Sequence, residues 1–287
     1  MIDLHTHTIY SDGTWNLKKL LEEAEKAQIE VLSITDHDTV KAYKELKKMD
    51  YQKIYHGKII SGAEFNTVFD GVAFHLLAYD FDYKKLDTWI YENYDNRKPN
   101  LEKEFEYMIQ SCKKNNIKIG DIVYDEEKGW PIDIIFAEIK KHIENKVFFK
   151  EEEWNNIDIF FNSCITNKKF PVFVDFAIHY PSANKVAEAV RNAGGKLFVA
   201  HLYRYNLEEP VKFLNMLRNS KIIDGIEVEH SCFTDEQCNI LKEYCRENNL
   251  LMSGGTDCHG DTKRDRKIGT GYGNMNINKK ILDGWNK

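Results

Sequence analysis

The sequence predicts an α/β fold in which a mostly parallel sheet closes into a barrel and a helical segment is inserted. Seven short apolar runs have the length and the β-branched or aromatic content of strands. Helical patterns lie between several of these runs, and such alternation is typical of parallel α/β proteins. One long central stretch carries helical patterns and no strand that ends in a possible metal ligand. Seven strands favour a barrel over an open sheet, and the central stretch predicts the insertion.

The predicted strands lead into polar residues or possible metal ligands. In chain order, the runs cover residues 2–4, 31–34, 59–62, 72–74, 197–200, 226–229 and 250–255, and they lead into His5, His37, Glu64, His75, His201, His230 and Asp257. Only residues 66–71 separate the Glu64 run from the His75 run. This link is too short for a crossover helix, so these two strands are expected to form a hairpin.

Apolar residues at helical spacing predict the helices that connect the strands. The spacing is present over residues 17–27, with Thr14 as the expected N-cap. It recurs over residues 186–193, 211–217 and 240–244. These segments are expected to pack one apolar face against the sheet.

The stretch 83–171 differs from the rest of the chain, because it is rich in Lys, Glu, Asn and aromatic side chains. We expect it to be a helical insertion domain that could cover the site. The barrel domain is then expected to comprise residues 1–82 and 172–287.

Composition limits the partners. The 287-residue chain has a formal net charge of −6 and a pI of about 6.0. This balance does not favour extended nucleic-acid binding, but it allows a small phosphorylated substrate such as a nucleotide. No apolar run approaches the ~18 to 20 residues that span a bilayer, so no membrane partner is expected. The six cysteines show no paired pattern, which indicates free thiols and a cytoplasmic protein.

Nine imidazole and carboxylate side chains are expected to meet at the carboxyl ends of the strands, where the loops converge. They are His5, His7, Asp12, His37, Glu64, His75, His201, Asp257 and His259. Burying so many ionisable groups is costly unless cations compensate for them. Nitrogen and oxygen ligands without thiolates suit Zn²⁺, Mn²⁺ or iron, so several divalent metal ions are expected.

Four segments resemble the motifs of the polymerase-and-histidinol-phosphatase (PHP) superfamily. They are DLHTHTIYSDGT at 3–14, ITDHDT at 34–39, AH at 200–201 and GGTDCHG at 254–260. GAE at 62–64 and FHLLAY at 74–79 resemble the intervening segments. Within the superfamily, the chain is most similar to bacterial stand-alone phosphoesterases that carry a helical insertion. The resemblance implies a distorted (βα)7 barrel with a trinuclear metal centre.

Carried over residue by residue, the resemblance implies three divalent metal ions (Mn, Zn or Fe). The first would be held by His5, His7, Glu64 and Asp257, the second by Glu64, His75 and His201, and the third by Asp12, His37 and His259. Three or four ligands for each metal would leave positions open for water and a phosphate.

Three further residues are candidates for contacts with a phosphorylated substrate. His230 lies where the family places a residue near the substrate, and we expect it to donate a proton or bind phosphate, with a structural role as the alternative. Arg204 could clamp a phosphate as a bidentate donor. Arg97 opens the insertion and could face either the site or the solvent. Five other polar residues are not expected to bind metal: His56, His142, His179, Asp36 and Asp38.

The resulting hypothesis is a metal-dependent phosphoesterase. It would hydrolyse a small phosphorylated metabolite, a nucleotide or an oligonucleotide end through a hydroxide that bridges two metals. The alternatives are a histidinol-phosphate phosphatase, a metal-dependent hydrolase of carbon–nitrogen bonds, and a catalytically silent metal-binding regulatory module. The family's insertion often contains an Arg-x-His segment, but GWPID occupies that place at 129–133, which leaves the substrate open.

Overall fold

The computed structural model describes residues 1–94, 97–167, 170, 172–175, 180–205, 207–262 and 266–285, without the side chains of residues 97–100. The chain divides into two compact units. The first comprises Met1–Tyr94, Pro181–Tyr203 and Glu209–Lys287, and the second comprises Asp95–Tyr180 and Arg204–Glu208. The sequence places the two main boundaries after residues 82 and 171, whereas the structure places them after residues 94 and 180.

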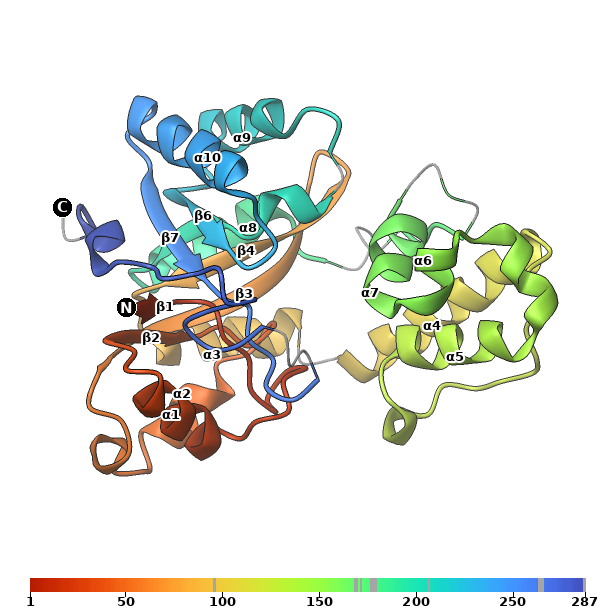
Figure 1. The fold of residues 1–287 in the computed structure, drawn as a ribbon, viewed down its shortest axis with the longest axis horizontal. Coiled ribbons are helices and arrows are strands. Elements are labelled where there is room, and N and C mark those ends of the chain that lie inside the picture. The colour runs from red at the N-terminus through yellow and green to blue at the C-terminus, as the bar shows by residue number, and fades with distance from the viewer. Residues whose placement is uncertain are drawn as a thin grey trace. The chain divides into compact units, whose positions relative to one another are not determined.

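A seven-stranded sheet forms the centre of the first unit (Figure 1). Its strands lie side by side in chain order: β1 (Ile2–Asp3), β2 (Val31–Ile34), β3 (Lys58–Phe69), β4 (Val72–Tyr79), β5 (Lys196–Val199), β6 (Gly225–His230) and β7 (Leu251–Gly255). Neighbours are parallel except that β4 is antiparallel to both β3 and β5. The edge strands also meet, because the Leu4 N–H donates to the Gly254 carbonyl oxygen at 3.1 Å. The sheet is therefore nearly closed, which confirms the predicted α/β barrel.

The third and fourth strands form the predicted hairpin. Its two turn residues, Asp70 and Gly71, have φ angles of 50° and 71°. A two-residue hairpin turn of type I′ requires positive φ at both positions, which an Asp-Gly pair tolerates well. The reversal places the start of β4 at the end of the barrel where the parallel strands finish. Glu64 and His75 lie within these two strands, so the expectation that each follows a strand end was wrong.

Amphipathic helices accompany the sheet in the described part of the first unit. They are α1 (Leu17–Lys26), α2 (Lys41–Leu46), α3 (Tyr83–Asn93), α8 (Ala183–Asn192), α9 (Pro210–Asn219) and α10 (Asp235–Glu247). Asn16 caps α1 by accepting the Lys19 N–H at 2.9 Å, so the expected N-cap Thr14 was wrong. The Thr14 hydroxyl instead donates to the carbonyl oxygen of His259 at 3.2 Å, which ties this loop to the segment that follows β7.

The second unit is helical in its described part and has an apolar core of its own. Its helices are α4 (Arg97–Lys114), α5 (Pro131–Lys141), α6 (Glu151–Asn155) and α7 (Ile157–Phe160), followed by a π-helical turn (Phe161–Ile165). Phe105, Met108, Ile135 and Phe160 are fully or almost fully buried in this core. Across the described ranges of the chain, we find no helix that is both long enough and apolar enough to span a membrane.

Apolar side chains fill the barrel at the end where the parallel strands begin. Leu77 and Tyr79 of β4 pack there with Ile2 and Phe198, and all four are fully buried. Tyr79 pairs with Lys196, the first residue of β5, which places this core at the amino end of the barrel. The carboxyl end is left to polar side chains.

Tyr43 of α2 joins two strands through its hydroxyl group. The hydroxyl oxygen accepts the N–H of Gly62 at 2.7 Å and of Ile34 at 3.1 Å, and it donates to the Ile34 carbonyl oxygen at 2.8 Å. Tyr43→Phe removes a buried partner from these groups, so we expect the free energy of unfolding in urea to fall by ~1–3 kcal/mol. Tyr91→Phe is the control, because Tyr91 is 67% exposed. Equal free energies for the two variants would contradict this role.

Candidate metal centre

The nine side chains that the sequence marks as possible metal ligands lie together at the carboxyl end of the barrel. They come from the loops that follow β1, β2, β5 and β7 and from the interior of β3 and β4: His5, His7, Asp12, His37, Glu64, His75, His201, Asp257 and His259. Metal binding by these residues stays a prediction, but their proximity is an observation.

Glu64 is the centre of this group. It is 1% exposed, and four imidazoles lie within 3.2 Å of its two oxygen atoms. Oε2 lies 3.0 Å from Nε2 of His5 and 3.2 Å from Nε2 of His7. Oε1 lies 2.8 Å from Nδ1 of His75 and 2.8 Å from Nε2 of His201. A carboxylate in this position can bridge two cations, one on the side of each oxygen.

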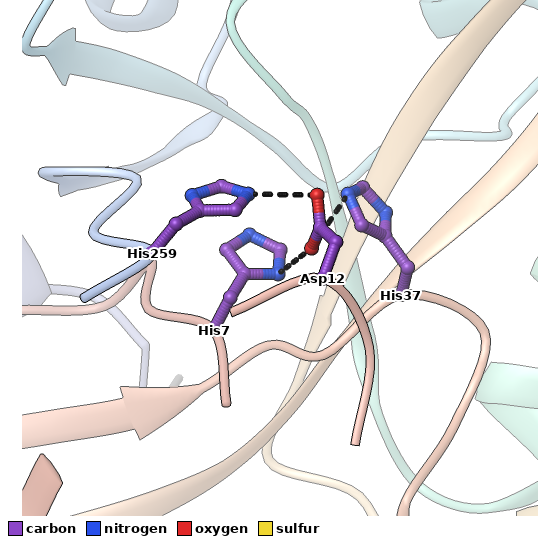
Figure 2. A group of neighbouring side chains, drawn as sticks. All are labelled: His7, Asp12, His37 and His259. Carbon is purple, nitrogen blue, oxygen red and sulfur yellow. Dashed lines mark hydrogen bonds and ion pairs between the residues drawn. The ribbon is translucent and has the colours of Figure 1, made fainter. Parts of the chain in front are cut away.

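Asp12 organises a second group of imidazoles (Figure 2). Its Oδ2 lies 3.1 Å from Nε2 of His259, and its Oδ1 lies 3.6 Å from Nδ1 of His7 and 3.9 Å from Nε2 of His37. The other ring nitrogen of His37 is 3.5 Å from Glu64 Oε2. The rings of His7 and His37 therefore lie between the two carboxylates and join the two groups into one cluster.

The donor set of the cluster fits divalent cations. Three of its buried atoms, His7 Nε2, Asp12 Oδ1 and His37 Nδ1, have no hydrogen-bond partner among the described residues. Buried polar atoms without partners are costly, and a cation bound between them would remove that cost. Nitrogen and carboxylate oxygen donors suit zinc, manganese or iron ions.

Electrostatics keeps the carboxylates of the cluster ionised. Burial alone favours the neutral acid of Glu64, but the neighbouring imidazoles, above all His37 and His5, hold its pKa well below the ordinary value. Burial likewise opposes protonation of His7, yet the adjacent Asp257 and Glu64 carboxylates raise its pKa to about 9. The site is therefore strongly attractive to positive charge, whether proton or metal ion.

Two residues of the cluster have left-handed backbone angles. Asp257 has φ 57° and His201 has φ 23°, a region that residues other than glycine rarely adopt. Such conformations cost on the order of 1–3 kcal/mol each and persist where surrounding contacts enforce them. Here they turn each side chain into the barrel directly after a strand ends.

Glu227 is a member of the site that the sequence did not mark. It is fully buried, its Oε1 accepts the His5 Nδ1–H at 2.8 Å, and its Oε2 accepts the His201 N–H at 2.7 Å. A carboxylate behind a metal-binding histidine fixes the ring and its tautomer, which leaves His5 Nε2 to face Glu64. A β-bulge between Glu227 and Glu229 separates this inward side chain from its outward neighbour. The sequence feature that could have identified Glu227 was an acidic residue inside an otherwise apolar strand.

His230 lies at the end of β6 beside the cluster and is fully buried. Its Nδ1 accepts the backbone N–H of Cys232 at 3.2 Å, so the neutral ring carries its proton on Nε2. That nitrogen lies 3.5 Å from Oδ2 of Asp257. In this neutral tautomer, Nε2–H can donate a hydrogen bond and cannot bind a metal ion.

Asp36 and Asp38 hold neighbouring segments rather than pointing at the centre of the cluster. Asp36 accepts the N–H of Thr8 at 2.6 Å and the hydroxyl of Ser11 at 2.8 Å, and so shapes the loop between His7 and Asp12. Asp38 accepts the N–H of Asn66 at 2.8 Å. Both carboxylates are therefore engaged in holding backbone segments beside the cluster.

The remaining candidates lie elsewhere or outside the described atoms. Arg204 groups with the second unit, so its role in phosphate binding stays a prediction. Arg97 is the first residue of α4, and its side chain lies outside the described residues, as does His179. His56 is exposed and lies 2.8 Å from Glu25, and His142 belongs to the second unit.

Comparison with known proteins adds a family and a fold. The PHP domain model matches residues 3–149. A 5′-3′ exoribonuclease from Haemophilus influenzae is 24% identical over 266 residues, which cover 90% of this chain and 89% of that protein. The 5′-3′ exoribonuclease Rnm from Escherichia coli is 31% identical over 80 residues, or 28% of this chain and 27% of that protein.

Two solved structures share the fold. A presumed metal-dependent phosphoesterase from Bifidobacterium adolescentis has a TM-score of 0.66 and 23% identity, covering 98% of this chain and 93% of that one. An amidohydrolase from Chromobacterium violaceum with bound sulfate has a TM-score of 0.68 and 17% identity, covering 93% of this chain and 89% of that one.

The placement of Glu227 behind His5 gives a testable consequence. Glu227→Gln keeps the size of the side chain but removes the charge that holds His5 Nδ1–H, so we expect Mn²⁺ to bind ~10–100-fold more weakly in calorimetric titrations. Glu229→Gln on the same strand is the matched control, because Glu229 faces outward and pairs with Lys242 at 2.7 Å. Equal Mn²⁺ affinity in the two variants would rule out this role for Glu227.

Proposed function

Since this chain belongs to the PHP domain family and is a metal-dependent phosphoesterase, we propose that it removes nucleotides from the 5′ end of short oligoribonucleotides. The observation that carries the chemistry is the buried Glu64 carboxylate, whose two oxygens face separate pairs of imidazoles. Similarity to a 5′-3′ exoribonuclease over 90% of the chain supports the choice of substrate.

We assign the ligands as the family resemblance implies, and the grouping of the side chains supports this for most of them, whereas His37 lies between Glu64 and Asp12. His5, His7 and Asp257 would hold one cation with Glu64 Oε2, His75 and His201 would hold a second with Glu64 Oε1, and Asp12, His37 and His259 would hold a third. When bound, paired divalent cations supply an activated water at neutral pH and neutralise charge that develops on phosphate oxygens. Manganese, zinc and iron all match these donors.

The protein's own groups supply the proton for the leaving oxygen. Cleavage from the 5′ end expels the 3′ oxygen of a ribose, a poor leaving group that needs a proton. We propose that His230 donates this proton from Nε2 of its imidazolium form, which leaves a neutral imidazole. Burial lowers the pKa of His230, but Glu227 and the neighbouring Asp257 outweigh burial and raise it, which favours the imidazolium form that can donate a proton. Arg204 and Arg97 remain our candidates for binding a phosphate of the substrate.

The net negative charge of the protein favours a short RNA substrate over a long one. The net charge of −6 provides no broad attraction for a polyanion, so recognition would rest on the few phosphates that reach the cations. A small phosphorylated metabolite would need the same catalytic groups, so the substrate experiment includes one.

The substrate is tested with Mn²⁺-reconstituted protein and a short RNA labelled on its 5′ phosphate. We expect a labelled mononucleotide as the first product and stepwise shortening of the same RNA labelled at its 3′ end. Asp257→Asn should abolish cleavage, because it removes a carboxylate next to His5 and His7. Asp283→Asn, at an exposed position, is the control. Turnover of histidinol phosphate with none of RNA, or full cleavage by Asp257→Asn, would overturn the proposal.

The role of His230 predicts a dependence on the leaving group. His230→Gln cannot donate a proton, so we expect RNA cleavage to slow by ~10²–10⁴-fold, the usual contribution of general acid catalysis. Hydrolysis of bis(p-nitrophenyl) phosphate should slow far less, because nitrophenolate leaves without a proton. An equal loss with both substrates, measured as kcat, would argue against proton donation by His230.

A further inference from the structure

Arg266 is a buried cation next to the proposed metal centre that neither the motifs nor the nine candidate ligands include. It lies in the segment that follows β7 and is 5% exposed. Its Nη1–H donates to Oδ2 of Asp257, and its Nε–H donates to the hydroxyl oxygen of Tyr272 at 3.2 Å. A buried guanidinium is always charged, and these two acceptors hold its plane in one orientation.

The two oxygens of Asp257 face different partners. Oδ1 lies 3.3 Å from Nε2 of His7 and 3.5 Å from Nε2 of His5, on the side of Glu64. Oδ2 points the other way, to Arg266 and to Nε2 of His230 at 3.5 Å. One oxygen of the Asp257 carboxylate therefore faces the cluster, and the other contacts the Arg266 guanidinium.

The segment that carries Arg266 is itself anchored. Lys267 and Gly271 exchange backbone hydrogen bonds at 3.0 and 2.8 Å. Within that turn, the Gly269 N–H donates to Oδ2 of the buried Asp3 at 2.8 Å. Asp3 also accepts the Thr256 N–H at 3.0 Å, one residue before Asp257. The guanidinium and the carboxylate that it contacts are therefore fixed to the same buried acid.

We infer that Arg266 is a positioning residue, which occupies Oδ2 of Asp257 so that this carboxylate presents a single oxygen to the metal held with His5, His7 and Glu64. The inference rests on the metal centre of the proposed function. Without Arg266, Asp257 could rotate or offer both oxygens, and a buried negative charge would lose its counterion. Arg266 contacts Oδ2 of Asp257, a proposed metal ligand. This contact distinguishes its role from that of a phosphate-binding arginine, whose N–H groups would point at the substrate.

The test measures Mn²⁺ binding to the full chain by calorimetry, with metal content per chain. We expect Arg266→Gln to weaken binding by ~10–100-fold, the usual effect of removing a group that orients a ligand. Arg246→Gln, at an exposed position of α10, should bind as the wild type does. Wild-type affinity in Arg266→Gln would overturn the inference.

A double-mutant cycle separates positioning from a general structural role. If Arg266 acts through Asp257, then Arg266→Gln adds no further loss of Mn²⁺ affinity in an Asp257→Asn background, whereas a purely structural role would give additive losses and overturn the inference. Should Arg266→Gln fail to fold, Tyr272→Phe keeps both charges and removes the acceptor of Nε–H, together with the contact between that hydroxyl and Cys232 Sγ at 3.6 Å. It should weaken Mn²⁺ binding by a smaller factor in the wild-type background alone, and unchanged affinity there would overturn the inference. These measurements need no cleavage, so a protein that binds Mn²⁺ but cleaves no RNA would refute only the proposed function.

Discussion

The whole carboxyl end of the barrel is organised around one buried carboxylate. Five imidazoles approach the two oxygens of Glu64 within 3.5 Å, and the carboxylate itself is 1% exposed. Such a concentration of ionisable groups is unstable unless charges alternate closely, so each histidine must be aimed with little freedom. The reversed direction of β4 serves this requirement, since it delivers His75 to the open side of Glu64 from the adjacent strand.

The orientation of the imidazole rings depends on buried acidic residues that contact the candidate ligands or the segments that carry them. Asp3, Asp36 and Glu227 are each 1% exposed or less and accept several hydrogen bonds from segments that are distant in the sequence. These contacts offset the cost of the left-handed backbone at Asp257 and His201. A catalytic geometry of this kind is therefore a property of the hydrogen-bonded shell as much as of the ligands.

The sequence predicts the barrel, the hairpin and the nine polar residues because each leaves a local pattern. A strand is a short apolar run, a pair such as His5 and His7 has i, i+2 spacing, and a six-residue link excludes a crossover helix. Glu227 and Arg266 leave no comparable pattern. In the sequence, Glu227 resembles any acidic residue of a half-exposed strand, and only the β-bulge reveals that it faces inward. Arg266 lies in a loop whose path depends on a contact with Asp3, which the sequence does not reveal. The prediction of Thr14 as the N-cap of α1 was wrong for a related reason, because its hydroxyl donates to the carbonyl oxygen of the distant His259.

The contact between the first and last strands has a consequence for how the chain is held together. Backbone pairing across this seam is slight, consisting of bonds such as Leu4 to Gly254 and Asp257 to His5. The same seam separates His5 and His7 from Asp257, residues about 250 positions apart. A cation bound by residues from both strands would act as a non-covalent cross-link that closes almost the entire chain into a loop. A cross-link that closes a long loop is the kind that restricts the unfolded state most. In that arrangement, catalysis and closure of the barrel share one bond network, and losing the metal would loosen the fold first where its two ends meet.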